Sequence, residues 1–137
     1  MAGPSPSRIA QLSDQVVIRI PASTKHVKLV TATATSLAAL LDFTYDRLMD
    51  LHIAIDEICS RIIATSVPPA TRLEITFDLK DGGLQISARG DSPLRKKTPF
   101  LTSWAKTILD EVTDQIEVRD VEGTAHATFS VARGRRL

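Results

Sequence analysis

The chain has 137 residues, of which 43% are hydrophobic, and this length and composition suit one domain with a real core. Its 17 Lys and Arg residues against 16 Asp and Glu leave a formal net charge of +1 with interspersed signs, so no basic face for direct nucleic-acid binding is expected. The single cysteine excludes an intramolecular disulfide framework.

The two ends of the chain show no pattern of a folded element. Residues 1 to 14 contain Pro, Ser and Gly without an apolar period, which predicts a disordered arm, and residues 1 to about 12 are expected to be dispensable for folding. The arm lacks the apolar region of a signal peptide, and no run approaches the roughly 18 apolar residues of a membrane span. We expect a cytoplasmic protein with one domain at residues 15 to 133 and a basic tail at 134 to 137.

A strand and two helices are predicted in the first half. Residues 15 to 22 are rich in β-branched side chains and reach a proline, which is typical of a strand that ends there. Ser23 or Thr24 can cap the helix that follows, and a second helix starts near Tyr45 and ends at Pro68-Pro69. The buried stripe of the first helix, at three- and four-residue spacing, consists of Val27, Val30, Ala34, Leu37 and Leu41. That of the second consists of Leu48, Leu51, Ile55, Ile58 and Ile62. Cys59, beside this stripe, is expected to be a core residue without a redox role.

Four strands and one helix are predicted in the second half. Residues 72 to 79 and 84 to 89 alternate between apolar and polar and flank a "KDGG" turn, which indicates a hairpin. The helix at residues 100 to 112 is expected to turn Leu101, Trp104, Ile108 and Val112 inward. Residues 115 to 120 and 124 to 133 form a second hairpin around "VEG". The order β-α-α-β-β-α-β-β predicts an α+β, two-layer sandwich, in which three helices cover one face of a mainly antiparallel sheet.

Most catalytic signatures are missing from the sequence. The three histidines, His26, His52 and His126, lie on separate elements, and no serine stands in a G-x-S-x-G turn. Neither a P-loop nor a dinucleotide fingerprint occurs, and no residue spacing suits a metal site. The candidate that remains is the stretch "LHIAIDEICSRIIA", in which Glu57 and Arg61 stand one helical turn apart.

By order and local wording the chain resembles the bacterial anti-sigma-factor serine kinases, the RsbW/SpoIIAB-like branch of the histidine-kinase-type ATPases. "IRIPASTKHVKLV" is similar to the family's first strand and helix, and "LHIAIDEICSRII" to its N-box helix, usually L-x-[LV]-A-V-x-E-A-C-T-N-A-I. "ISARGDSP" is similar to the second box, often V-x-D-x-G-x-S, and "ILDEVTDQIEV" with "GTAHATFSVAR" to the last helix and closing hairpin. The resemblance runs from about Val16 to Arg133 and implies the histidine-kinase-like ATPase fold.

The nucleotide motifs of that family are degenerate here. The resemblance implies a general base at Glu57, but the magnesium-binding Asn is Arg61, and a permanent cation cannot hold another cation. The adenine-binding Asp is Ala88, the following Gly is matched by Gly90, and the family's glycine-rich lid is replaced by "PLRKKTPFLTSW". We expect magnesium-ATP to bind weakly or not at all.

Two roles remain open for the pair on the helix. Glu57 and Arg61 can form a partly buried ion pair, which contributes about 0.3–0.5 kcal/mol when exposed. Alternatively, the positive charge of Arg61 replaces the magnesium ion and binds a phosphate group directly, assisted by Lys96 and Lys97.

The resemblance implies a role in the control of stress-response transcription. The first hypothesis is an anti-sigma factor, a homodimer that sequesters an alternative sigma factor and is released when an anti-anti-sigma protein of the STAS type competes for it. The alternatives are an active kinase that phosphorylates a serine of that antagonist with ATP, and a degenerate module that only senses nucleotide. Arg61, Ala88 and the missing lid glycines favour the binding protein.

Overall fold

The computed structural model describes residues 14–80, 82–95 and 99–134, and the predicted arm, Lys96, Lys97 and most of the tail lie outside these ranges. The elements follow in the order β1 (Gln15–Pro21), α2 (Thr24–Leu40), α3 (Tyr45–Thr65), β2 (Arg72–Lys80), β3 (Gly83–Gly90), α4 (Ser103–Val112), β4 (Gln115–Val121) and β5 (Thr124–Ala132). Every predicted element is present, and the boundaries agree to within a few residues.

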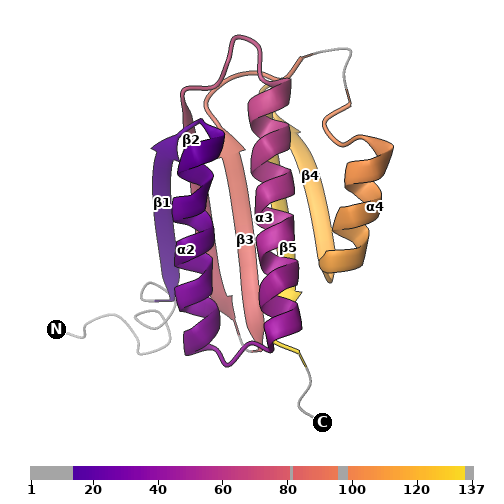
Figure 1. The fold of residues 1–137 in the computed structure, drawn as a ribbon. Helices are drawn as coiled ribbons and strands as arrows, with labels where there is room; N and C mark the ends of the chain where they lie inside the picture. Colours follow the sequence, from indigo (N-terminus) through magenta and orange to yellow (C-terminus); the bar gives the residue numbers. More distant parts are fainter. Residues whose placement is uncertain (1–13, 81, 96–98, 135–137) are drawn as a thin grey trace, which may run out of the picture.

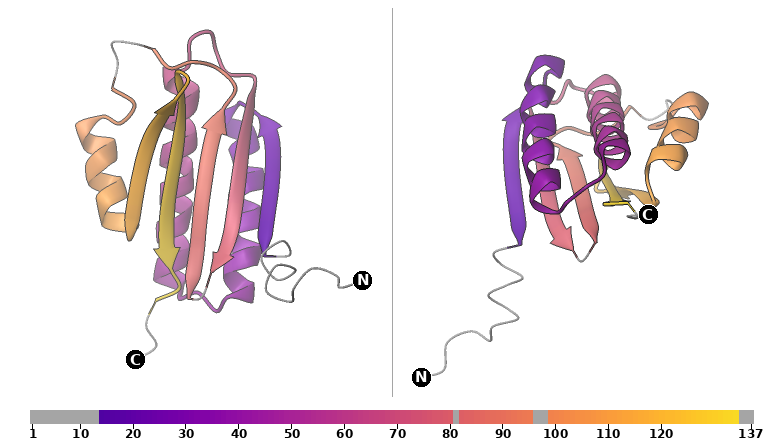
Figure 2. Two further views of the ribbon diagram at one scale, coloured as in Figure 1. Left: turned by 180° about the vertical axis from the view of Figure 1, so that it is seen from behind. Right: turned by 60° about the horizontal axis from the view of Figure 1, so that its bottom comes forward.

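In the described part of the chain the strands form one antiparallel sheet in the order β1-β2-β3-β5-β4. All three helices lie on the same face of this sheet, with α2 over β1 and β2, α3 over the centre and α4 beside β4 (Figures 1 and 2). Within residues 14–80, 82–95 and 99–134 the other face carries no helix (Figure 2). The predicted two-layer α+β sandwich is therefore confirmed.

The core lies between the sheet and the helices. Alternate residues of the central strands point toward α3, so Ile75, Phe77 and Phe129 are fully buried. From the helix side, Ile55, Ile58 and Ile62 supply the matching apolar stripe. Each such side chain contributes about 1.5–3 kcal/mol relative to its exposed state, which makes this layer the main source of stability.

Three apolar residues that the periodicity predicted to be buried are only half-buried. Leu41 is the residue that ends α2, Leu48 belongs to the first turn of α3, and Leu79 stands at the hairpin end of β2. All three pack against the edge of the core. Their partial exposure follows from their position at the ends of elements, where neighbouring layers cover them on one side only.

The prediction that Trp104 points inward is wrong. The hydroxyl of Thr102 accepts a hydrogen bond from the Ala105 amide at 3.1 Å, so α4 starts at Ser103 and its buried face is Ala105, Leu109 and Val112. Trp104 stands 72% exposed, and Ile108 is half-buried. The predicted inward positions of Leu101 and Val112 are confirmed, but in the middle of the helix Ala105 and Leu109 take the buried places predicted for Trp104 and Ile108.

No helix among the described residues is long and apolar enough to cross a membrane.

Cys59 lies in the core, and we expect its thiol to react slowly in the native protein. It is 1% exposed, and burial, assisted by the nearby Asp56 charge, raises the pKa of the thiol to about 12. Because the thiolate is the reactive species, labelling by a disulfide reagent at pH 8 should be more than about a hundredfold slower than in guanidinium chloride. Equal labelling rates in the two conditions would show that the thiol is accessible.

Candidate functional site between α3 and α4

Arg61 joins the C-terminal half of α3 to the segment that leads into α4. Its Nε donates a hydrogen bond to the Phe100 carbonyl oxygen at 2.7 Å, and its Nη2 donates to the Pro99 carbonyl oxygen at 3.2 Å. Phe100 and the following Leu101 also pack against the core. The guanidinium therefore holds a segment that lies 38 and 39 residues further along the chain.

The predicted ion pair between Glu57 and Arg61 is not formed. The salt bridges among the described residues do not include it, and the Glu57 side chain is half-buried without a hydrogen-bond partner there. Arg61 donates to the two main-chain carbonyls instead, and hydrogen bonds from a charged donor are stronger than those between neutral groups. The expected ion pair is thus corrected to a contact between a side chain and the main chain.

Ala88 lies on the face of β3 that points into the core. It stands opposite Ile75 of β2 and Ala127 of β5, and it is 3% exposed. Its methyl group offers no hydrogen-bond acceptor. The position is therefore part of the apolar core.

Gly90, at the end of β3, is required for close packing. A Cβ at this position would approach Cγ2 of Ile62 on α3 to 2.8 Å, a distance that real Cβ atoms do not show. Glycine thus lets α3 approach the end of the sheet. This structural need accounts for Gly90 without a ligand.

Asp91 and Ser92, which follow Gly90, hold the loop between α3 and β2. The Asp91 carboxylate accepts hydrogen bonds from the Thr71 amide at 2.8 Å, the Arg72 amide at 3.2 Å and the Thr71 hydroxyl. The Ser92 hydroxyl donates to the Pro68 carbonyl oxygen. These bonds, the Thr71 hydroxyl first, lower the pKa of Asp91. The acidic residue of this motif acts as a structural acceptor.

We expect Asp91→Ala to lower the free energy of unfolding by about 1 kcal/mol, since the donors of Thr71 and Arg72 lose their acceptor at a solvent-exposed site. A carboxylate with a lowered folded pKa stabilises the fold above its ordinary pKa near 3.8, and this contribution disappears as the pH falls through the lowered value. The difference between wild type and variant, measured by urea unfolding, should therefore shrink below about pH 4. Asp91→Asn, which keeps one acceptor oxygen, is the matched control and should lose less. A difference that stays constant with pH would contradict this role.

Residues 93–95, which precede the residues that Arg61 contacts, also form hydrogen bonds with the C-terminal end of α3 and the residues that follow it. The Arg95 amide donates to the Thr65 carbonyl oxygen at 2.6 Å, and the Val67 amide donates to the Pro93 carbonyl oxygen at 2.8 Å. Leu94 forms an isolated bridge with Ser66. The chain is thus attached to the end of α3 at residues 93–95 and again at residues 99 and 100. Lys96 and Lys97, predicted to assist in phosphate binding, lie outside the described residues.

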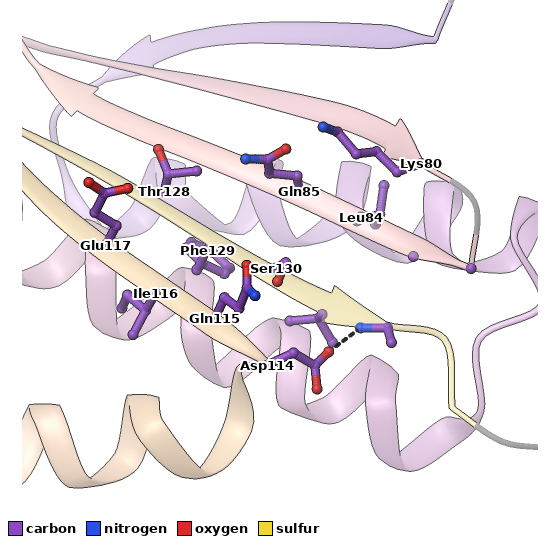
Figure 3. Close-up of a pocket in the computed structure, with 14 residues that line it drawn as sticks. Lys80, Leu84, Gln85, Asp114, Gln115, Ile116, Glu117, Thr128, Phe129 and Ser130 are labelled. Carbon is purple, nitrogen blue, oxygen red and sulfur yellow. Dashed lines mark hydrogen bonds between the residues drawn. The ribbon is translucent and has the colours of Figure 1, made fainter.

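Two pockets lie away from Glu57, Arg61 and Ala88. One, of about 960 Å³, is lined by β2, β3, β4 and β5, and its polar side chains Lys80, Gln85, Glu117 and Thr128 stand on the sheet face without helices (Figure 3). At its edge the Asp114 carboxylate accepts a hydrogen bond from the Ala132 amide (Figure 3). The other, of about 430 Å³, includes Gly90 and Asp91. Among the described residues no three His, Cys, Asp or Glu side chains gather as metal ligands would.

Sequence reasoning named Arg61 but missed its partners. The acceptors are main-chain carbonyls of Pro99 and Phe100, which every residue type carries, so no side-chain pattern could have identified them. The role of Asp91 was open to inference, because Asp followed by Ser-Pro is typical of a turn in which the carboxylate accepts main-chain amides.

Known proteins support both the fold and the family. No protein-family model matches the chain. The serine-protein kinase RsbW of Bacillus subtilis (strain 168) is 29% identical over 144 residues, which cover 91% of this chain and 90% of that protein. The protein of the same name from Bacillus velezensis (strain DSM 23117 / BGSC 10A6 / LMG 26770 / FZB42) is 28% identical over 143 residues, covering 90% of this chain and 89% of its own length.

A crystal structure of the RsbU and RsbW domains of Rv1364c from Mycobacterium tuberculosis matches 90% of this chain with a TM-score of 0.67 and 14% identity. This chain spans about a third of that longer one, 34% of its length. The match shows that the chain shares its fold with part of that structure, in agreement with the histidine-kinase-like ATPase fold that the resemblance implies. Together with the sequence similarity to the Bacillus proteins, it supports the RsbW-like family of anti-sigma factor kinases that the sequence motifs predicted.

Proposed function

We propose that this protein is a cytoplasmic anti-sigma factor that binds an alternative sigma factor without using ATP. It acts as a homodimer and releases the sigma factor when an anti-anti-sigma protein of the STAS type competes for it. The family assignment supports sigma-factor and antagonist partners for proteins of this kind. Activity then consists of protein binding, with no chemical step.

The observation that carries this proposal is the position of the Arg61 guanidinium. Two of its nitrogens donate to the carbonyls of Pro99 and Phe100, so the side chain is engaged with the protein itself. A permanent cation in this place repels a magnesium ion and offers it no lone pair. Without a metal, a triphosphate would bring about four negative charges to a site that neutralises few of them.

The adenine side of the site gives independent support. Ala88 is buried among apolar residues and has no acceptor, and the segment 91–102 contains no glycine. A glycine-free segment with several main-chain contacts to α3 does not suit a lid that opens and closes over a ligand.

One observation favours the kinase alternative. The relatives in Bacillus are called serine-protein kinases, and Glu57 occupies the family's general-base position with a carboxylate that makes no hydrogen bond in the described residues. An unengaged, half-exposed carboxylate is chemically able to accept a proton from a serine hydroxyl. The hypothesis of an active serine protein kinase therefore has to be tested beside that of an anti-sigma factor that acts by binding alone.

Calorimetric titration with each purified alternative sigma factor of the source organism distinguishes the two. We expect one sigma factor to bind with submicromolar affinity in the absence of ATP, and to lose its transcription activity with RNA polymerase in the complex. The cognate STAS protein should restore transcription without incorporating phosphate from labelled ATP. If no sigma factor binds, the proposal fails, and phosphate incorporation on a STAS serine would establish the kinase instead.

A further inference from the structure

The start of α4 has two sources of attachment to the rest of the domain. One is apolar, since Phe100 and Leu101 pack against the core. The other is the pair of hydrogen bonds from Arg61 to the carbonyls of Pro99 and Phe100. Thr102, two residues after Phe100, caps the helix through its hydroxyl. The guanidinium thus binds the main chain two and three residues before Thr102, the N-cap residue of α4.

We propose that Arg61 is a positioning residue that fixes the N-terminal end of α4 on α3 from within the chain, so that no nucleotide is needed to order this region. If the proposed anti-sigma function holds, partner binding is independent of ATP for the same reason. The role differs from both roles predicted for Arg61, which were an ion pair with Glu57 and a phosphate contact.

Arginine has the chemistry for this task. Its planar guanidinium presents several N–H donors in fixed directions, so one side chain can reach the carbonyl oxygens of two successive residues. No carboxylate neutralises it in the described residues, because the nearest candidate on its own helix, Glu57, does not pair with it. The guanidinium hydrogens that point to the segment before α4 are therefore donated to the carbonyl oxygens of Pro99 and Phe100. A lysine could reach one of these oxygens but not both.

The remaining contacts of α4 define which part of the helix should open when the hydrogen bonds from Arg61 are lost. Ala105, Leu109 and Val112 bury the rest of the helix, so the loss of Arg61 should free the first turn and leave the body of the domain folded. The Ala105 and Lys106 amides, which donate to Thr102, report on this turn directly. Local opening of this kind is visible as faster amide hydrogen exchange without global unfolding.

The test is hydrogen exchange on the whole chain, comparing wild type with Arg61→Gln, Arg61→Lys and Arg119→Gln. Arg119 is the matched control because it is an exposed arginine on β4 that pairs with Glu117. We expect the Ala105 and Lys106 amides to exchange at least about tenfold faster in Arg61→Gln, with partial rescue in Arg61→Lys and wild-type rates in Arg119→Gln. The urea midpoint of global unfolding should change little in all three, and 1 mM magnesium-ATP should not slow exchange in the wild type.

Three results would overturn the proposal. Unchanged exchange in Arg61→Gln would mean that Phe100 and Leu101 hold α4 without the guanidinium. A fall in global stability that matches the local change would give Arg61 a general structural role. Protection of the wild type by magnesium-ATP would show that a nucleotide orders the region. The measurement needs no partner, so failure to bind any sigma factor would defeat the proposed function and leave this result standing.

Discussion

Titration of the wild-type protein with magnesium-ATP is expected to show no binding below about 1 mM. The residue in the metal-binding position is Arg61, which donates hydrogen bonds and cannot coordinate a cation. Ala88 stands where the family has an Asp, so the charged acceptor for the adenine amino group is missing. A hydrogen bond to a charged acceptor contributes roughly 1.5–3 kcal/mol, or about ten- to a hundredfold in affinity. Because the two losses affect different parts of the same ligand, they compound.

The controls for this titration distinguish ATP binding that needs the magnesium ion from ATP binding through the positive charge of Arg61. ADP with magnesium, and ATP with EDTA, should give equally flat traces. Binding of ATP in the low micromolar range would contradict the prediction, and binding that persists in EDTA would identify Arg61 as a cation that serves phosphate directly. In that case the kinase or the nucleotide-sensing alternative would become the leading interpretation.

Ala88→Asp should destabilise the protein severely, by about 3 kcal/mol or more at pH 7. The position faces the core between Ile75 and Ala127, so a carboxylate there would be buried among apolar side chains without a partner. Urea unfolding followed by circular dichroism measures the loss. Since native domains are stable by only about 5–15 kcal/mol, a change of this size removes a large part of the total.

The pH dependence of this variant has a definite sign. Burial raises the pKa of a carboxyl group, so its neutral form is tolerated better than its charged form. The loss of stability should therefore be smaller at pH 4 than at pH 7. Ser87→Asp is the matched control, because Ser87 is the preceding residue of β3 and points to the open face of the sheet. Equal losses for the two variants would mean that position 88 is not part of the core.

The nature of each element and the two hairpins were predictable because they depend on local patterns, whereas the pairings of β1 with β2 and of β3 with β5 join segments far apart in the chain. The alternation of apolar and polar residues along 72 to 79, and the helical spacing of apolar residues in α3, show which side of each element is apolar. The apolar side is the one that is buried. Tight turns then force neighbouring strands to be antiparallel. The phase of α4 was not predictable in this way. A ten-residue helix with apolar side chains at both Trp104 and Ala105 admits two stripes, and the packing against the core selected the one with the smaller side chain.

By itself the sequence determined the α+β sandwich, and its motifs pointed to the family and to the degenerate nucleotide positions, because each of these rests on which residue types occur and at what spacing. It also marked Arg61 as the residue that departs most from the family pattern. Only the tertiary structure decided what Arg61 does. Its partners are main-chain oxygens about 40 residues away, which carry no side-chain signature, and they come within reach only when the segment before α4 folds back onto α3.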